Sequence, residues 1–405
     1  MLRLEVKENG RIVLELPRAE VGQGLTTAMA MLVAEEMGAK LSDVDVVLSD
    51  ARPELLFNQI TGASTSTRTL FTPVRLAPAG ARLRLLRVYA EEVGYRADKL
   101  RIRDGVVVAP DGASASFGSL TAAAAKLGEP VIGPSPKPYN DYTLVGKPTN
   151  RMDQRNHITG RTKFCWDLDV PGRSRPLWPG RRRSGAPSRI STKTPYARCP
   201  GSSTWRGSRP ASRSWPRRSG RRWPPRRRSR PGTARAGSTG CPTPTSARSV
   251  ATAGKWGRKM RSGHAQGFAI NEEHRSAVAV LVEIDATDPK NPRVYKAVMA
   301  FDAGLPINPR GLEAQMLGGL NDGISTVLYA GNHLDNGVFR ETSYTDFGYA
   351  KQRHYPINVE MYVMPKTTDE PGGAGETTVS AAGGAVANAY ARATGSKPRN
   401  FPINF

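Results

Sequence analysis

The chain has 405 residues, of which 38% are hydrophobic and 23% are charged, so it is long enough for two or three domains and a substantial core. Its formal net charge of +24 would ordinarily indicate a nucleic acid or an anionic membrane as partner. No run of eighteen apolar residues is present, which argues against a membrane span. The three cysteines have no C-x-x-C spacing, so this chain alone cannot hold an iron–sulfur centre.

The positive charge is concentrated in one block. Residues 171–250 contain twenty Arg, one Lys and no acidic residue, whereas the other 325 residues carry 38 basic and 35 acidic side chains. Leu, Ile, Val, Met and Phe together contribute only three residues to the block. So few apolar side chains cannot offset the entropy lost on folding, and we expect a disordered segment over 173–254.

Three interpretations of this block compete. An arginine-rich nucleic-acid arm would explain the charge, and its four tryptophans could stack on bases. A Pro/Arg-rich linker is the plainer alternative. Codons made of G and C encode Gly, Ala, Pro and Arg, so GC-rich coding DNA read in a wrong frame also gives this mixture. Patterned sequence stops near Pro171 and resumes near Lys255 without a polar taper, which favours the wrong frame.

Before the block, the sequence predicts mixed helix and strand. The expected elements are a hairpin over 2–16 turning at Asn9-Gly10, a helix over 24–37 ending at Gly38, a strand over 43–48, a helix over 66–93, and a hairpin over 100–108 turning at Asp104-Gly105. We expect Pro73 and Pro78 to interrupt the long helix.

After the block, the pattern is of the same kind. The expected elements are paired strands over 278–285 and 294–301, a helix over 309–329, a strand over 359–363, and an Ala/Gly-rich helix over 377–393. The fold class is therefore α+β, with an inserted Arg/Pro-rich segment. The chain begins with a strand rather than a charged and then apolar leader, so we expect no signal peptide and a cytoplasmic location.

Two Gly-rich joints precede helices. In AEVGQGL, Gln23 lies between Gly22 and Gly24, and in PGGAGET, Glu376 follows Gly375. Glycine lets the backbone approach a bulky ligand, and a helix N-terminus offers free N–H groups to anions. The plainer alternatives are a solvent-facing turn for Gln23 and a carboxylate that favours the helix dipole for Glu376. Neither joint has the spacing of a phosphate-binding loop.

Four stretches, in order, resemble the molybdenum-binding subunit of the xanthine oxidase family. They are PRAEVGQGLTTAMAMLVAEEMG, TGASTSTRTLFTPVR, YTLVGKPTNRMDQRNHITGRTKFCWDLDVPG and residues 256–405, which contain AFDAGLPINP, LEAQMLGGLNDGIS and PGGAGETTVSAAGGAVANAYARATG. Within that family the chain is most similar to the beta subunit of isoquinoline 1-oxidoreductase and to aldehyde-oxidising relatives. The resemblance implies mixed α/β molybdopterin-binding domains over 1–140 and 255–405, and the start of a hammerhead-like domain over 141–172.

The resemblance also implies roles for individual residues. Gln23 matches the glutamine that hydrogen-bonds an oxo ligand of molybdenum, and Glu376 matches the glutamate that acts as general base. A carboxylate suits that step when partial burial raises its basicity. The remaining cofactor-binding residues that the resemblance implies are Gly22, Gly24, Ser64, Thr65, Gln315 and Gly375. No side chain is expected to ligate the metal directly.

The implied cofactor is molybdenum–molybdopterin in its cytosine dinucleotide form. The implied reaction hydroxylates an aldehyde or an N-heterocycle with oxygen taken from water, and a small [2Fe-2S] partner subunit removes the electrons. We expect no membrane association, and only non-specific binding of nucleic acid through the basic block. A basic nucleic-acid-binding protein is the alternative function.

The sequence departs from the family pattern at its centre. The resemblance passes from Pro171 directly to the region near Trp256, and the central Gly-Gly-x-Phe-Gly loop of the family is absent. Most residues that shape the substrate pocket are absent with it. We therefore expect a damaged gene whose ancestral function is legible and whose product is impaired or inactive.

Overall fold

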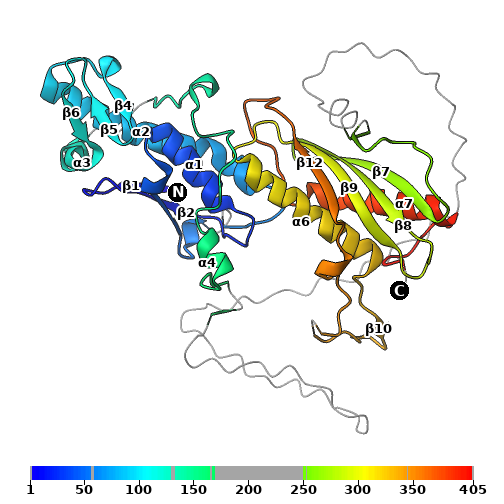
Figure 1. Ribbon diagram of the computed structural model, residues 1–405. Coiled ribbons are helices and arrows are strands. Elements are labelled where there is room, and N and C mark those ends of the chain that lie inside the picture. The colour runs from blue at the N-terminus through cyan, green and yellow to red at the C-terminus, as the bar shows by residue number, and fades with distance from the viewer. Residues whose placement is uncertain are drawn as a thin grey trace, which may run out of the picture. The chain divides into compact units, whose positions relative to one another are not determined.

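The computed structural model describes residues 2–55, 59–128, 133–164, 167–168, 250–251, 253–343 and 345–403 (Figure 1). The chain divides into two units, one formed by residues 1–166 with 238–405 and the other by residues 167–237. Helices and strands mix within the first unit, so the predicted α+β class is confirmed. Apart from its last few positions, the basic segment predicted over 173–254 lies outside the described residues.

The first part of the chain begins with a three-stranded sheet in the order β1-β2-β3. Its strands are β1 (Arg3–Val6), β2 (Ile12–Leu16) and β3 (Val44–Leu48), with β1 antiparallel and β3 parallel to β2. The helix α1 (Leu25–Met37) connects β2 to β3 and ends at Gly38, whose left-handed φ of 68° makes it a C-cap, as the sequence predicts. The alternating burial of β2 and the buried face of α1 form one core.

The helix α2 (Ser66–Val93) runs without a break through Pro73 and Pro78. The predicted interruption is therefore wrong. A proline inside a helix costs about 3 kcal/mol, but α2 buries Leu70, Phe71 and Val74 around the first proline, and Pro78 is itself buried. Tertiary packing therefore outweighs local preference here.

A small sheet follows, made of β4 (Arg101–Arg103), β5 (Val106–Val108) and β6 (Ser114–Ser116). Its first hairpin turns at Asp104-Gly105 as predicted, with both residues at positive φ. The helices α3 (Phe117–Lys126) and α4 (Gln154–Ile158) were not predicted. The short 3-10 helices are η1 (Leu41–Asp43), η2 (Pro53–Leu55), η3 (Ala97–Lys99), η4 (Tyr139–Asp141) and η6 (Gln352–His354).

The second part contains a four-stranded sheet in the order β12-β9-β8-β7. Its strands are β7 (His264–Glu273), β8 (Ser276–Asp285), β9 (Arg293–Asp302) and β12 (Asn358–Val363), and only β12 pairs in parallel. Two long helices, α6 (Pro309–Leu328) and α7 (Thr377–Thr394), pack on one face of this sheet. The strand β7 was missed because its run contains Gly267 and several polar residues.

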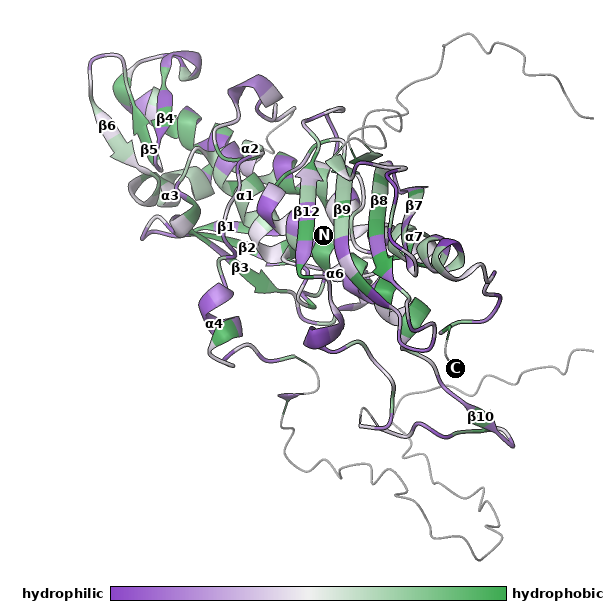
Figure 2. Ribbon diagram, turned by 45° about the vertical axis from the view of Figure 1, so that its right-hand side comes forward, coloured by the Kyte–Doolittle hydropathy of each residue, from purple (hydrophilic) through white to green (hydrophobic). Residues whose placement is uncertain are grey.

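Both faces of the central strands are buried and carry apolar side chains. Figure 2 shows β8 as a largely hydrophobic strand. Val278, Val280 and Val282 face α6 and α7, whereas Ala279 and Leu281 face the other way. Gly267 lets α7 approach closely, since a Cβ there would lie 2.0 Å from the Ala385 carbonyl oxygen. A small hairpin of β10 (Leu334–Asp335) and β11 (Val338–Phe339) completes the described strands.

Helix is present before residue 254, where the sequence predicts that the basic segment ends. Val250 and Ala251 are helical, and Val250 is fully buried against the outer face of β8 and β9. The expected boundary at 254 therefore lies too late in the chain. One valine among Ser, Ala and Thr residues carries too little apolar signal for composition to reveal this packing.

The two parts of the first unit meet along a short backbone seam. Gly146 N donates to Ile307 O at 2.9 Å. Asn308 brackets the backbone of Thr149, accepting from its N at 3.0 Å and donating to its O at 3.0 Å. This seam lies beside the N-terminus of α6 and brings that end of the helix to the first part of the chain. None of the helices among the described residues is long and apolar enough to cross a membrane.

Candidate functional site

A cleft of about 280 Å³ lies between the two Gly-rich joints. Four helices present their N-termini to it, because Gly24, Thr65, Asn308 and Glu376, the N-cap residues of α1, α2, α6 and α7, all line the wall. None of the four makes a side-chain capping bond to its own first turn. Helix N-termini carry positive partial charge, so the cleft suits an anionic ligand.

The four helix ends differ in their neighbours. At α1, the Glu20 carboxylate already accepts from the backbone N of Gly24 at 2.9 Å and of Thr26 at 3.1 Å. At α7, the Glu376 carboxylate stands at the helix start. Among the described residues, no carboxylate accepts from a backbone N in the first turn of α2 or α6, so these two ends are the positions best suited to bind a further anion.

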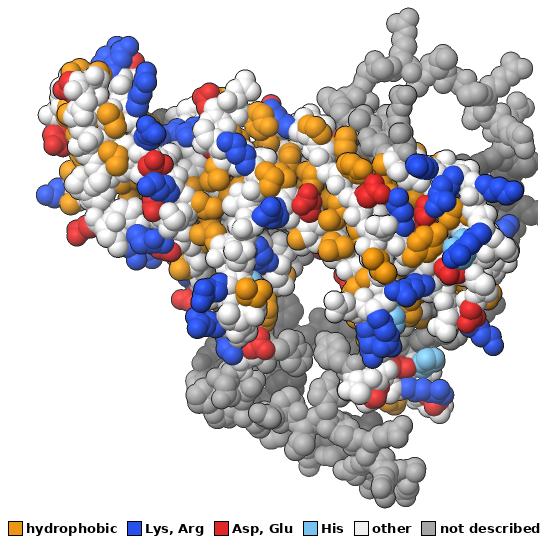
Figure 3. Space-filling view, in the orientation of Figure 1, with side chains coloured by type: hydrophobic (Ala, Val, Ile, Leu, Met, Phe, Trp, Pro, Cys, Tyr) orange, Lys and Arg blue, Asp and Glu red, His pale blue; other side chains and the backbone are white. Residues whose placement is uncertain are grey.

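A buried cation lies behind the start of α2. Arg18 is only 5% exposed, and its guanidinium donates to Thr69 Oγ1 at 3.1 Å, to Thr65 Oγ1 at 3.5 Å and to the Ile60 carbonyl. All three partners are neutral oxygens, and burial lowers the pKa of Arg18. A buried guanidinium beside a helix N-terminus adds positive potential to this wall. Elsewhere on the face drawn in Figure 3, Lys and Arg are interspersed with Asp and Glu.

The PGGAGET joint is built from close backbone approaches. Gly372 N donates to Ala303 O at 2.7 Å, and Gly373 N donates to His274 O at 3.0 Å. A Cβ at position 373 would lie 2.5 Å from Ser64 O and 2.9 Å from His274 Cβ. Only glycine fits between these two segments, so the joint holds the loop before α2 against the turn between β7 and β8.

Ser64 connects the two parts of the chain at the cleft. Its hydroxyl donates to the Glu376 carboxylate and accepts from Glu376 N at 3.0 Å. Ala63 and Ser64 both have left-handed φ, at 51° and 48°, a conformation that costs non-glycine residues free energy. Such strain persists where surrounding contacts fix the backbone, and Gly373 and Glu376 supply those contacts here.

Glu376 is exposed to solvent, which differs from the partial burial expected of a general base. Gly375 beside it is exposed as well, whereas Gly373 and Thr377 are buried. Gly375 and Glu376 therefore form an exposed rim of the cleft.

Gln23 is half-buried, and its side chain closes its own loop. The amide oxygen accepts from Val21 N at 2.7 Å, and the amide nitrogen donates to Ala19 O at 3.1 Å. Gln23 still lines the cleft, together with the Pro371–Glu376 joint from the far end of the sequence. A ligand contact through the amide would compete with these two local bonds or add to them.

Seven of the eight residues predicted from the sequence line this one cleft. They are Gln23, Gly24, Ser64, Thr65, Gln315, Gly375 and Glu376. Gly22 is not among the lining residues; it is exposed to solvent, with a φ of 109°. Among the described residues, no group of three or more His, Cys, Asp or Glu side chains could hold a metal ion.

Sequence reasoning missed Asn308, Glu20 and Arg151. Asn308 stands directly before a proline at the first position of α6, which is a recognisable helix-start signal. Glu20 lies next to a joint that the sequence did identify. Arg151 had no usable signal, since it reaches Gly22 on this wall from 129 residues farther along the chain.

The family model of the molybdopterin cofactor-binding domain matches residues 2–159 and 237–356, which together exceed half of the chain. Residues 173–236 of the basic segment fall in the unmatched gap, whereas 237–254 fall inside the match. This second matched segment starts at the same place as the second piece of the first structural unit, near residue 238.

Among the proteins similar to this chain are two curated proteins and one solved structure. A nicotinate dehydrogenase subunit of Pseudomonas putida is 32% identical over 173 residues, which cover 42% of this chain and 14% of that protein. The beta subunit of isoquinoline 1-oxidoreductase from Brevundimonas diminuta is 27% identical over 208 residues, covering 42% and 27%. The chain thus spans less than a third of either relative.

The solved structure is quinoline 2-oxidoreductase from Pseudomonas putida 86. It superposes with a TM-score of 0.52 over 99% of this chain and 36% of that one, at 14% sequence identity. At this identity the likeness concerns the fold alone. The helices and sheets of the first unit therefore follow an arrangement known from a larger protein.

Proposed function

Because this chain belongs to the molybdopterin cofactor-binding domain family, we propose that its cleft binds molybdenum–molybdopterin in the cytosine dinucleotide form. We further propose that it is part of the large subunit of a two-subunit hydroxylase acting on an aldehyde or an N-heterocycle. One observation carries the proposal: Gln23, Ser64, Gln315 and Glu376, far apart in sequence, line a single cleft.

The residues of the cleft fit such a group chemically. The open N-termini of α2 and α6, with buried Arg18 behind Thr65, suit a pyrophosphate. The amides of Gln23, Asn308 and Gln315 offer donors and acceptors to a pterin ring, and Gly372 and Gly373 keep the wall thin. A bound molybdenum cofactor supplies a redox-active metal that takes up two electrons while oxygen from water enters the substrate.

Glu376 is proposed to accept a proton during this reaction. Ser64 Oγ donates to one carboxylate oxygen and fixes the orientation of the side chain, so the other oxygen is the one that takes the proton. A Cβ added at Gly375, next to Glu376, would lie 3.1 Å from Ser64 Oγ. Glycine at this position therefore leaves room for the contact between Ser64 and Glu376.

A partner is proposed because the chain has nowhere to pass electrons. Its cysteines, Cys165, Cys199 and Cys241, do not have the spacing of an iron–sulfur ligand set. We propose a small [2Fe-2S] subunit as the electron acceptor, and a cytoplasmic location for the pair. The basic segment is proposed to contact nucleic acid only non-specifically, with a steep dependence on salt.

We propose that activity is impaired in the chain as written. The exposed rim at Gly375 and Glu376 supports this, as does the family match, which passes over residues 160–236. A proton acceptor at an exposed position is not shielded from competing water. Reading the encoding DNA across codons 165–260 in all three frames tests the cause. A frame that restores Val, Leu, Ile and acidic residues supports a frameshift, whereas Arg/Pro-rich frames throughout contradict it.

The function is tested by expressing the full chain with an iron–sulfur subunit in a host that makes the cofactor. We expect pterin and molybdenum well below one per chain, with little turnover of aldehydes or N-heterocycles. The residual pterin should disappear in Gly373→Val and persist in Gly318→Ala, whose position is open. No pterin at all in the parent chain contradicts cofactor binding, whereas one molybdenum per chain with turnover contradicts impairment.

Glu376→Gln separates binding from chemistry. The variant should retain as much pterin as the parent, because the carboxylate is proposed to move a proton and not to hold the cofactor. Any turnover should be lost. Equal turnover in parent and variant contradicts the assigned role of Glu376.

A further inference from the structure

The loop before α1 is organised around one carboxylate. Glu20 accepts from the backbone N of Gly22 and Gly24, both at 2.9 Å, and from Thr26 N at 3.1 Å and Thr26 Oγ1 at 3.2 Å. The side chain of Glu20 is 9% exposed, so these bonds are largely shielded from water. Gln23 occupies the middle of this loop.

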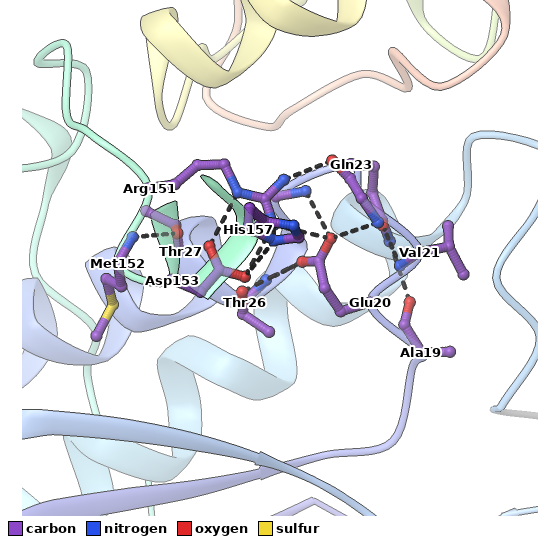
Figure 4. A network of polar contacts seen from close by, with 12 residues as sticks. Ala19, Glu20, Val21, Gln23, Thr26, Thr27, Arg151, Met152, Asp153 and His157 are labelled. Atoms are coloured by element: carbon purple, nitrogen blue, oxygen red, sulfur yellow. Dashed lines mark hydrogen bonds and ion pairs between the residues drawn. The ribbon is translucent and has the colours of Figure 1, made fainter. Parts of the chain in front are cut away.

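Arg151 closes the same loop from outside. Its guanidinium donates to the Gly22 carbonyl and lies 3.4 Å from Glu20 Oε1. On its other side it forms a two-point bond to Asp153, with Nε to Oδ1 at 2.9 Å and Nη2 to Oδ2 at 2.8 Å. Figure 4 shows Arg151 between Asp153 and His157 on one side and the Glu20–Gln23 loop on the other.

The partners of Arg151 fix its direction. His157 Nε2 lies 2.7 Å from Arg151 Nη2 and 3.0 Å from Asp153 Oδ2, so α4 supports the far side of the guanidinium. The hydrogen bond to Asp153 raises the pKa of Arg151. A planar guanidinium held at two points has little freedom left, and its Nη1 donates to the Gly22 carbonyl of the loop. Met152 N also donates to Thr27 Oγ1 at 3.1 Å, which attaches the same segment to α1.

We propose that Arg151 is a positioning residue that holds the Gln23 loop on the cleft wall, with Glu20 as its partner inside the loop. The role of Gln23 at a cofactor rests on the proposed function, but the positioning itself does not. Without Arg151, Glu20 keeps its backbone bonds and loses its counter-charge, and the Gly22 carbonyl loses its donor. The loop should then open more often, although the rest of α1 stays packed.

The test uses hydrogen exchange of the full chain without cofactor. Arg151→Met should raise the exchange rate of amides at 22, 24 and 26 about tenfold, because local opening becomes easier. Arg151→Lys should have a smaller effect, since an ammonium keeps the charge but not the two-point bond. Arg96→Met is the matched control, because Arg96 forms the same Arg-x-Asp bond to Asp98 and is 83% exposed. In Arg96→Met, the amides at 22, 24 and 26 should exchange at the same rate as in the parent.

Unchanged exchange in Arg151→Met, or an equal rise throughout α6 and α7, overturns the proposal. The functional readout is the amount of pterin that each chain retains after co-expression with the iron–sulfur subunit, compared between variants that unfold at the same temperature. This amount should fall in Arg151→Met and not in Arg96→Met. A loosened loop with undiminished pterin overturns the link between this loop and the cofactor. If the parent itself holds no pterin, the proposed function fails, and the exchange data still decide the positioning role.

Discussion

The two walls of the cleft are held in different ways. The Pro371–Glu376 wall is held by backbone contacts, because Gly372 and Gly373 press against Ala303, His274 and Ser64 with no room for a Cβ. The Ala19–Gly24 wall is held by side chains, with Glu20 inside the loop and Arg151 outside it. One wall depends on close approach, and the other depends on charge.

This difference predicts how each wall responds to change. A wall made of backbone contacts tolerates changes of pH and salt but no added atom. A wall made of ionised side chains tolerates added atoms at its surface but depends on the charge state of its carboxylates. Substitutions that separate steric from electrostatic effects therefore test the comparison.

The largest effect is expected from Gly373→Ala. The new Cβ would lie 2.5 Å from Ser64 O and 2.6 Å from Ser64 Cβ, and a backbone oxygen cannot turn away. Overpacking of this kind costs about 3 kcal/mol. Chemical denaturation of the full chain should show this loss of unfolding free energy at both low and high salt.

Gly318→Ala is the matched control for that change. Gly318 lies in α6, where a Cβ would meet nothing within 4 Å. Alanine should stabilise the helix there by about 0.5–1 kcal/mol. Similar losses in the two variants would contradict a wall built on close approach.

A smaller loss is expected from Glu20→Ala. The change leaves three backbone N–H groups and the Thr26 hydroxyl without their acceptor, which costs about 1–2 kcal/mol at a partly shielded site. Glu54→Ala, which removes an exposed ion pair with Arg52, should cost about 0–1 kcal/mol. Equal unfolding free energies for Glu20→Ala and the parent would show that charge does not hold this wall.

The smallest effect concerns pH. The hydrogen bond from Arg151 lowers the pKa of Asp153 in the folded chain. The carboxylate therefore stabilises the fold at any pH above its unfolded pKa of about 3.9. This stabilisation is lost as the pH falls through the pKa of Asp153 in the folded chain. The difference in unfolding free energy between the parent and Asp153→Asn should therefore be largest near neutral pH and shrink in acid. A difference that stays constant from neutral pH into strong acid contradicts the assignment.

The sequence predicted one wall better than the other, and the reason is physical. Gly373 and Gly375 stand beside Glu376 in one short motif, so a local pattern contains most of that wall. Ser64 was predicted only by resemblance, because its contact with Glu376 spans 312 residues. Arg151 could not be predicted, since an Arg-x-Asp pair such as Arg96 with Asp98 looks the same in sequence and reaches no other loop.

The regular elements were predicted where periodicity or turn chemistry was strong. The Asn9-Gly10 and Asp104-Gly105 hairpins and α1, with its Gly38 cap, are examples. The break expected at Pro73 and Pro78 was wrong because packing of α2 determines that helix. The helical residues at Val250 and Ala251 were missed because Val250 packs in one cluster with Leu281, which lies outside any local sequence window.

The central claim is that two distant segments of the chain share one cleft, and an engineered disulfide tests it most directly. A Cβ at position 375 would lie 3.8 Å from Ser64 Cβ, which is about the mean separation in disulfides. In a chain whose native cysteines are replaced by serine, Ser64→Cys with Gly375→Cys should form a bridge almost completely under mild oxidation, as peptide mass mapping would show. Ser64→Cys with Gly318→Cys should remain reduced. A reduced first pair, or equal bridging in both pairs, would contradict the shared cleft.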